Sequence, residues 1–197
     1  YNLATITLHD SLRTIGCYAF QDCVKLQKIT IPKSVTTIRE GAFYRCRSLK
    51  TVEFSSLTND DVEDTLECIE KNVFRGCSSL AEITIPDGVK KIMNRAFRGC
   101  RQLPSITLPH DLEAIGSRSF MKCKRLKDIN FREEGEREVL IDNVLVLPPS
   151  LAVGTGAFNF CKELTHVRLE EGTVAVKERL FMNCYSLTSI DLPSSLT

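Results

Sequence analysis

The sequence contains no tryptophan and only three methionines and three histidines among its 197 residues. It has no apolar run close to the roughly 18–20 residues that a bilayer span requires, which excludes a transmembrane helix. The 26 basic and 25 acidic side chains leave a net charge of +1, so the charge of the whole chain gives no argument for nucleic acid or an anionic membrane as a partner. No signal peptide is visible, although the chain begins with Tyr1 rather than methionine.

Residue patterns that carry catalysis are also missing. The three histidines stand in no H-x-x-x-H or H-E-x-x-H arrangement, and the pairs His9-Asp10 and His110-Asp111 are sequence neighbours rather than oriented dyads. Neither a glycine-rich phosphate loop nor a serine in a nucleophile elbow is present. We therefore expect a non-enzymatic protein with no metal ion and no cofactor. An enzyme regulated through this chain would need a catalytic domain outside these residues.

What the chain does contain is an internal repeat. A phenylalanine followed three residues later by a cysteine occurs seven times, in AFQDC, AFYRC, VFRGC, AFRGC, SFMKC, AFNFC and LFMNC. These phenylalanines are Phe20, Phe43, Phe74, Phe97, Phe120, Phe158 and Phe181. Four of the six intervals between them are 23 residues, and the other two are 31 and 38. A leucine follows every one of these cysteines by three residues, so a single structural unit repeats along the chain.

Each unit continues with an alternating apolar–polar–apolar run, which predicts a half-buried strand. The runs are ITI at 29–31, VEF at 52–54, ITI at 83–85, ITL at 106–108, INF at 129–131, VRL at 167–169 and IDL at 190–192. Residues 3–8 supply an eighth copy, and together these strands predict one elongated parallel sheet. A V-x-x-I segment then leads into A-F-x-x-C, where the i, i+3 spacing of phenylalanine and cysteine predicts one or two turns of helix.

The unit L-x-x-I-x-I-P-x-S-V-x-x-I-x-x-x-A-F-x-x-C resembles the BspA-like class of leucine-rich repeats, and residues 26–46 match it at every defining position. The resemblance covers the chain apart from two insertions. It implies an α/β leucine-rich-repeat solenoid that is β-rich, with 23-residue repeats, a right-handed superhelix, a parallel sheet and short helical turns. For function it implies a scaffold for protein–protein, matrix or adhesion interactions, at a cell surface or secreted.

Residues 1–197 are expected to form a single array of seven A-F-x-x-C units, with insertions near 55–65 and 132–147. The first insertion is acidic, because residues 56–70 hold six acidic and no basic side chains. In the second, the apolar segments 139–141 and 144–147 predict a β-hairpin that packs against the solenoid. The array starts and stops inside a repeat without the polar caps that solenoids need, which indicates a fragment of a longer protein. The alternative function is a structural subunit whose ends or faces are covered within a larger multi-protein assembly.

The nine cysteines are an odd number, so at least one is free of any intramolecular disulfide. Seven of them occur once per repeat, which differs from the paired spacing of zinc ligands and indicates small buried core residues. Cys17 and Cys68 lie outside this column, and Cys17 is expected to be an exposed thiol. Free thiols fit a reducing compartment, so an intracellular location stays open beside the one that the resemblance implies.

One candidate binding surface is the concave sheet, where the polar residues between the apolar strand positions face outward. Its outward columns contain small polar groups and scattered charges, among them Glu53, Glu82, Asp128 and Arg168, and no aromatic residue. Because aromatic anchors dominate tight protein interfaces, we expect this face to bind weakly or to be merely solvated.

The second candidate surface is a basic stripe around the A-F-x-x-C turns. Residues 92–127 hold eight basic and two acidic groups. The stripe consists of Arg45, Arg47, Arg75, Arg98, Arg101, Lys122, Lys124, Arg125 and Lys127. We expect a protein with an acidic surface, or an anionic glycan, to contact Arg98, Arg101, Lys122 and Arg125. Nucleic acid is disfavoured because no aromatic residues interleave with the basic ones, and a solvated face without a partner is the remaining alternative.

Overall fold

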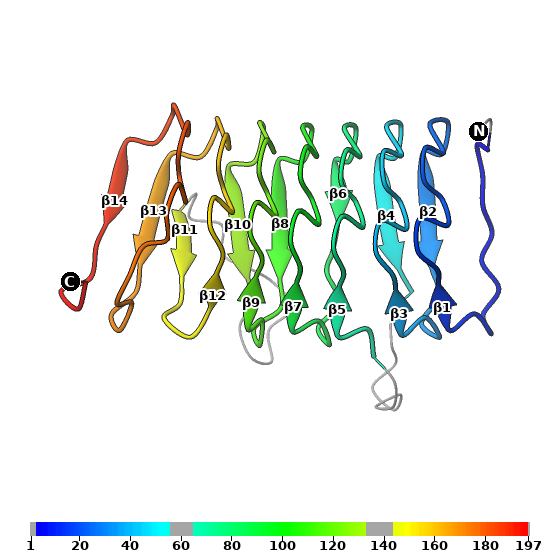
Figure 1. The fold of residues 1–197 in the computed structure, drawn as a ribbon, viewed down its shortest axis with the longest axis horizontal. Helices are drawn as coiled ribbons and strands as arrows, with labels where there is room; N and C mark the ends of the chain where they lie inside the picture. Colours follow the sequence, from blue (N-terminus) through cyan, green and yellow to red (C-terminus); the bar gives the residue numbers. More distant parts are fainter. Residues whose placement is uncertain (1–2, 56–64, 133–143, 197) are drawn as a thin grey trace.

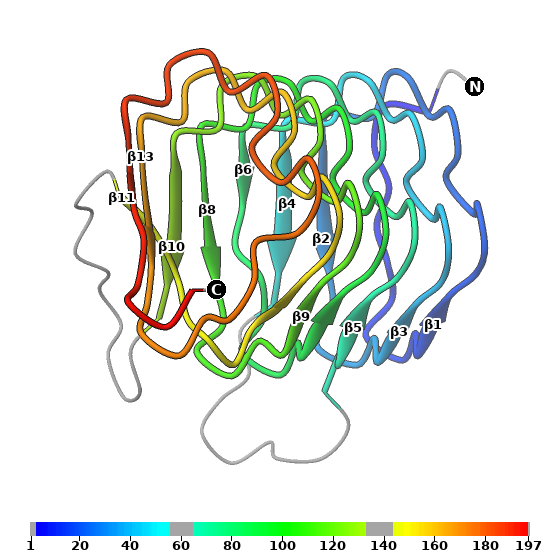
Figure 2. The ribbon, with the colours of Figure 1, turned by 60° about the vertical axis from the view of Figure 1, so that its left-hand side comes forward.

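A computed structural model describes residues 3–55, 65–132 and 144–196, and its backbone winds into a stack of about seven coils (Figure 1). One side of the stack, the strand face, carries β2 (Lys28–Ile31), β4 (Thr51–Phe54), β6 (Glu82–Ile83), β8 (Ser105–Leu108), β10 (Asp128–Phe131), β11 (Val144–Leu147), β13 (His166–Leu169) and β14 (Ser189–Asp191). A second side carries shorter strands, as the turned view shows (Figure 2). They are β1 (Thr14–Ile15), β3 (Thr37–Ile38), β5 (Cys68–Ile69), β7 (Lys91–Ile92), β9 (Ala114–Ile115) and β12 (Ala152–Val153).

All strand pairs are parallel, which confirms the predicted solenoid. The V-x-x-I segments form a six-stranded sheet in the order β1-β3-β5-β7-β9-β12. The strand face forms three sheets, β2-β4-β6, β8-β10 and β11-β13-β14, and a single parallel bridge between Thr84 and Thr107 links the first two, so the one continuous sheet expected there is not formed. Residues 3–8, expected as an eighth strand, form none, although Ile6 and Leu8 pack against the core.

The second insertion contributes a strand to the array. Val144–Leu147 becomes β11, which pairs in parallel with β13 and places Val144 opposite His166. Leu145 and Leu147 are buried in the common core. The other arm of the expected hairpin, residues 139–141, lies outside the described residues, as do the acidic residues of 56–64.

The core is organised around a ladder of phenylalanine rings, one from each coil. Successive rings stack with centroids 5.3–5.8 Å apart and with interplanar angles of 1–18°. The five inner rings are fully buried, whereas Phe20 and Phe181 at the two ends are half-buried. Because each coil buries its ring against the next one, neighbouring coils stabilise each other and no coil has a separate core.

The predicted helical turns are absent, since the described residues contain no helix. In the second coil, the Cys46 amide donates to the Phe43 carbonyl three residues earlier (3.2 Å), but the Phe43 amide donates to Val73 of the next coil (3.0 Å). Two left-handed residues four positions apart flank each phenylalanine. These pairs are Tyr18/Asp22, Gly41/Arg45, Asn72/Gly76, Arg95/Gly99, Arg118/Lys122, Gly156/Phe160 and Arg179/Asn183. Left-handed residues break a right-handed helix, and amides used between coils cannot close helical bonds.

No helix suited to crossing a membrane occurs in the described ranges. The turns instead join the two strand-bearing sides of every coil, and they stack in register along one edge of the solenoid (Figure 1). Equivalent turn positions therefore form straight columns of side chains.

Candidate functional site

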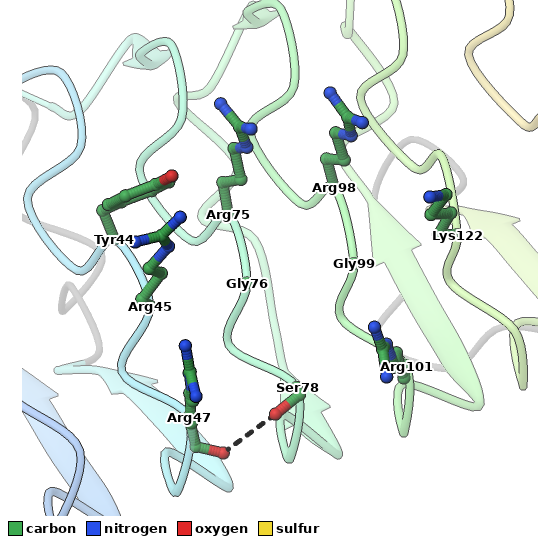
Figure 3. Close-up of a pocket in the computed structure, with 10 residues that line it drawn as sticks. All are labelled: Tyr44, Arg45, Arg47, Arg75, Gly76, Ser78, Arg98, Gly99, Arg101 and Lys122. Carbon is green, nitrogen blue, oxygen red and sulfur yellow. Dashed lines mark hydrogen bonds between the residues drawn. The ribbon is translucent and has the colours of Figure 1, made fainter. Parts of the chain in front are cut away.

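A basic groove lies across the stacked turns of four consecutive coils (Figure 3). It encloses about 430 Å³ and is lined by Tyr44, Arg45, Arg47, Arg75, Gly76, Ser78, Arg98, Gly99, Arg101 and Lys122. The lining residues occupy three columns of the repeat: the two positions after each phenylalanine and the position after each cysteine. The groove is thus a direct product of the repeat register, which places residues 23 or 31 positions apart in sequence side by side.

Two glycines form the floor of the groove. Gly76 and Gly99 follow one another in the same column, and Figure 3 shows bare backbone there between two rows of basic side chains. Both have left-handed backbones, with φ of 79° and 82°. In this column Arg45 and Lys122 stand on either side of the glycines with the same backbone conformation, so left-handed geometry does not itself require glycine. The absence of side chains at the two glycines leaves a depression that is open above Gly99 and is bounded at Gly76 by Arg45, whose Cγ would lie 3.3 Å from an added Cβ.

The lining carries one sign of charge. It contains five arginines and one lysine and no acidic residue, and none of these six cations forms an ion pair with a described residue. Burial lowers the pKa of the Arg98 guanidinium, and the positive charge of neighbouring Arg75 lowers it further. Mutual repulsion among these groups therefore favours any anion that enters the groove.

Tyr44 is the only aromatic residue of the lining, and its ring is already engaged. The guanidinium carbons of Arg45 and Arg75 lie 4.9 Å and 5.3 Å from the ring centroid, within the range of cation–π attraction. Arg75 also donates from Nη1 to Asn72 Oδ1 (3.3 Å). These contacts fix two of the arginines at one end of the groove.

Of the four basic residues expected to bind a partner, the structure places three in the groove and one outside it. Arg98, Arg101 and Lys122 line the groove together, but Arg125 does not. Arg125 donates from Nη1 to Gln102 Oε1 (3.0 Å), and its Nε lies 4.0 Å from Glu163 Oε1. The sequence pattern missed the two floor glycines as site residues, although their alignment in one column was a readable signal.

On the strand face, opposite charges satisfy each other. Lys28 Nζ forms an ion pair with Glu53 Oε1 at 2.6 Å, and the Thr30 hydroxyl donates to Glu53 Oε2 at 3.2 Å. The hydrogen bond from Lys28 lowers the pKa of Glu53. Arg168 Nε lies 3.3 Å from Asp191 Oδ2, in a different hydrogen-bonded part of the face. Glu82 lies near Glu53, since it pairs with Thr51 of β4. These three expected contact residues are exposed, and none of them lines the basic groove.

Asp128, expected to face outward with them, is instead only 6% exposed. The strand β11 is part of the second insertion and packs beside β10, which removes Asp128 from solvent. Its Oδ2 lies 3.7 Å from Lys127 Nζ, whereas its Oδ1 has no hydrogen-bond partner in the described chain. A strand that an insertion adds cannot be placed from the repeat pattern alone.

The histidines contribute only surface contacts. Asp111 lies between Lys90 Nζ and His110 Nδ1, each 2.7 Å from one of its oxygens, and Lys90 first and His110 second lower the pKa of Asp111. His9 contacts the Ser11 hydroxyl at 2.9 Å. Within the described ranges, no three His, Cys, Asp or Glu side chains gather as a possible metal site.

Comparison with known proteins agrees with the repeat geometry. The sequence pattern described as the BspA type leucine rich repeat region matches the chain in six copies, over residues 1–59, 54–138 and 142–197. The chain belongs to this family. No curated protein matches it. The BspA-type repeat explains the coil, its parallel strands and its phenylalanine ladder, and leaves the exposed columns free to vary.

Solved structures of leucine-rich repeat proteins are similar to the chain over most of its length. A leucine-rich repeat protein of Bacteroides ovatus is 29% identical, with a TM-score of 0.73, over 94% of this chain and 42% of that one. The T. pallidum leucine-rich repeat protein is 28% identical, with a TM-score of 0.58, over 93% of this chain and 64% of that one. A leucine-rich cell surface protein of Faecalibacterium prausnitzii is 33% identical, with a TM-score of 0.57, over 65% of this chain and 32% of that one. The chain thus spans less than two thirds of each of these proteins.

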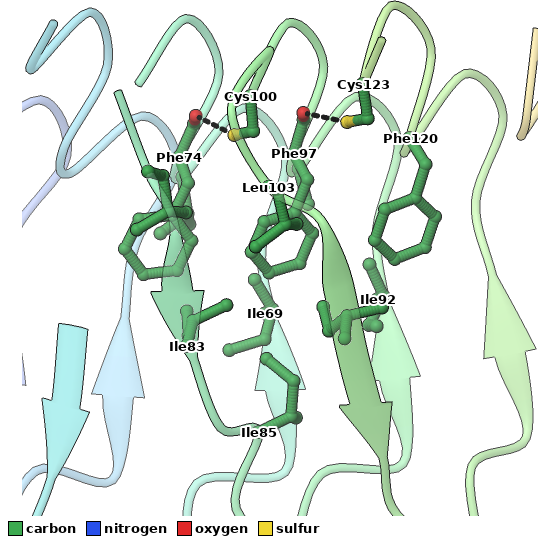
Figure 4. Packing of buried hydrophobic residues seen from close by; sticks show 14 of the residues in the cluster. Ile69, Phe74, Ile83, Ile85, Ile92, Phe97, Cys100, Leu103, Phe120 and Cys123 are labelled. Carbon is green, nitrogen blue, oxygen red and sulfur yellow. Dashed lines mark hydrogen bonds between the residues drawn. The ribbon is translucent and has the colours of Figure 1, made fainter. Parts of the chain in front are cut away.

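The cysteine column of the BspA-type repeat is buried, as the sequence predicts (Figure 4). Six of its thiols donate to the carbonyl of the phenylalanine in the preceding coil, at 3.0–3.4 Å. Burial raises the pKa of Cys184 to about 11 and the pKa values of Cys77, Cys100 and Cys161 well above the usual value. A buried, protonated thiol is a poor nucleophile, so these four cysteines are structural.

We expect Ellman's reagent at pH 8 to modify one thiol of the native protein rapidly. Cys17 is exposed, whereas Cys68 is half-buried and burial raises its pKa, so Cys68 reacts more slowly. The seven column thiols are buried in the core, where the reagent cannot reach them, so they react only after unfolding in guanidinium chloride. Cys17→Ser serves as the control and removes the rapid phase. More than two rapid thiols in the native protein would contradict burial of the column.

Proposed function

We propose that the chain is a non-enzymatic interaction scaffold that holds the anionic surface of a partner in the basic groove. The observation that carries the proposal is the concentration of six cations around one open depression with no acid among them. The proposal treats residues 1–197 as a single leucine-rich-repeat array. Leucine-rich repeats typically serve binding rather than catalysis, and solenoids present extended surfaces to partners.

The likeness to the F. prausnitzii protein, described as a leucine-rich cell surface protein, supports a role in binding at a cell surface. The strand face is the weaker alternative, because Glu53 and Arg168 are each neutralised by a neighbouring charge. The last coil supports a second candidate function. Its exposed apolar side chains favour a structural subunit whose ends are covered in a larger assembly. Val174, Tyr185 and Leu192 are 67%, 70% and 59% exposed.

Charge reversal tests the site. We expect the triple variant Arg98→Glu, Arg101→Glu, Lys122→Glu to slow association with immobilised heparin or polyglutamate at least tenfold, measured by surface plasmon resonance, because it removes the attracting field. Binding of the wild type should weaken as added salt screens that field.

Two matched controls accompany this variant. Arg125→Glu changes an equally basic residue outside the groove and should have a clearly smaller effect than any single reversal within it. Glu53→Lys with Glu82→Lys and Arg168→Glu alters the strand face and should leave association with both polyanions as fast as in the wild type, or faster. Loss of binding in the strand-face variant with retention in the groove variant would move the site to the strand face.

A further inference from the structure

We propose that the basic groove is a binding site for a linear sulfated glycan, with one sulfate group over the Gly76–Gly99 floor and further sulfates on the flanking arginines. This inference rests on the proposed function, since it names the partner of the same groove. It follows from the shape of the floor, from the composition of the walls and from the length of the basic region.

The floor suits a compact anionic group. A Cβ on Gly99 would meet nothing closer than the Gly76 backbone at 3.9 Å, so the space above it is open to a ligand rather than filled by neighbouring side chains. Arg75 and Arg98 project along one side of this space and Arg47 and Arg101 along the other (Figure 3). Guanidinium groups bind oxyanions through two parallel hydrogen bonds, and here they approach from both sides.

The walls favour a sugar polymer over an acidic protein. Protein partners gain most of their affinity from apolar and aromatic anchors that fill pockets. The groove offers no aliphatic pocket, and its one aromatic ring, Tyr44, is flanked by Arg45 and Arg75. The same engagement of Tyr44 counts against single-stranded nucleic acid, whose bases need open aromatic faces on which to stack. A polyanion that binds through charge and hydrogen bonds alone needs neither feature.

The length of the basic region limits the ligand. In the floor column, Asp22 precedes Arg45 and Phe160 follows Lys122, and the Lys122 ammonium lies 5.9 Å from the Phe160 ring. The cationic stretch therefore covers four coils, which are spaced 5.4–5.5 Å apart at the phenylalanine ladder. We infer that a short oligosaccharide fills the site and that affinity per site stops rising beyond that length.

The chain itself supplies a matched pair of test variants. Asn183 and Asp22 occupy the column position of Gly99 in other coils, with left-handed φ of 61° and 55°. Gly99→Asn and Gly99→Asp therefore place side chains of equal size in a backbone conformation that both residues adopt elsewhere in this protein. They differ only in whether the groove gains a negative charge.

The experiment is calorimetric titration with size-fractionated heparin oligosaccharides. We expect Kd to reach a plateau with increasing length, and Gly99→Asp to bind at least tenfold more weakly than Gly99→Asn at equal thermal stability. Arg101→Gln, which changes an exposed side chain and no backbone geometry, provides a second test and should also weaken binding. Octaglutamate and a desulfated heparin fraction of the same length serve as competing probes and should bind at least tenfold more weakly than the sulfated sugar.

The outcomes separate this inference from the proposed function. Equal affinity for octaglutamate and heparin, both lost in the groove variants, would overturn the sulfated glycan and leave the scaffold with an acidic partner. Equal binding by Gly99→Asp and Gly99→Asn, or an unchanged Kd in Arg101→Gln, would overturn the glycine-floored site. Failure of every anionic probe to bind the wild type would refute both proposals.

Discussion

Replacing Phe97 with alanine is expected to lower the free energy of unfolding by roughly 3–5 kcal/mol, the usual cost of removing a buried aromatic ring. Phe97 is fully buried and stacks against Phe74 and Phe120 at 5.4 Å on both sides, so its loss leaves a cavity in the middle of the ladder. Because the coils depend on their neighbours, the cavity also weakens the coupling between the two halves of the array.

Urea denaturation followed by circular dichroism measures this effect, and a broadened transition would report partial uncoupling of the halves. Phe20→Ala is the control, since Phe20 has one stacking neighbour and is half-buried in the first coil. We expect a distinctly smaller loss there. Equal losses at the two positions would mean that the ladder does not stabilise the stack through its interior.

Gly116→Ala is expected to lower the free energy of unfolding by about 1–3 kcal/mol, because a methyl group forced into a packed region displaces its surroundings. An added Cβ would lie 2.5 Å from the Asn94 amide nitrogen and 2.7 Å from the Met93 carbonyl carbon, both of which belong to the backbone of the preceding coil. It would also crowd Asn94 Oδ1, which accepts the Ser117 amide at 2.8 Å.

Gly16 provides the matched control, since it follows β1 as Gly116 follows β9. A Cβ on Gly16 meets no atom within 4 Å, and we expect Gly16→Ala to be neutral or slightly stabilising through reduced freedom of the unfolded chain. Thermal denaturation of both variants tests the comparison. If Gly116→Ala melts no lower than Gly16→Ala, the close approach of successive coils at this position is wrong.

Much of the fold could be predicted from the sequence because the repeat is strict. The alternating runs after each leucine identified β2, β4, β6, β8, β10, β13 and β14, and the single cysteine per unit indicated a buried column. The six-stranded second sheet was missed, since its strands are two residues long and too short to show an alternating pattern. Residues 3–8 carry the strand pattern, but hydrogen bonding to a neighbour decides whether a strand forms.

The prediction of helical turns was wrong, and the sequence partly showed the reason. An i, i+3 spacing fits a helix, but it also fits a turn whose amides donate hydrogen bonds alternately to carbonyls of their own coil and of the next coil. Gly41, Gly76 and Gly99 fall beside the phenylalanines and could have signalled left-handed backbone. Arginine or tyrosine at equivalent positions hid that signal, because such residues seldom adopt it.

The sequence predicted the positive charge of the candidate site but not its shape. The sequence placed Arg98, Arg101 and Lys122 in one basic stripe, and the structure brings them into one groove. Arg125 carries the same charge but turns toward Glu163, which stands 38 residues away and enters the neighbouring coil only after the second insertion. The repeat pattern of the sequence could not predict that contact, and it could not predict the burial of Asp128 beside β11.

The parallel register also bears on how such a surface changes over generations. Where no insertion intervenes, strand partners in successive coils are 23 residues apart, as in Lys28 and Thr51 or Ser105 and Asp128. A gene segment of that length can therefore be duplicated or lost without disturbing the pairing on either side. A second copy of residues 82–104 would add one more bare backbone position and two more arginines to the groove. The length of the basic groove then becomes an inherited quantity that changes in whole steps, by copy number rather than by point substitution.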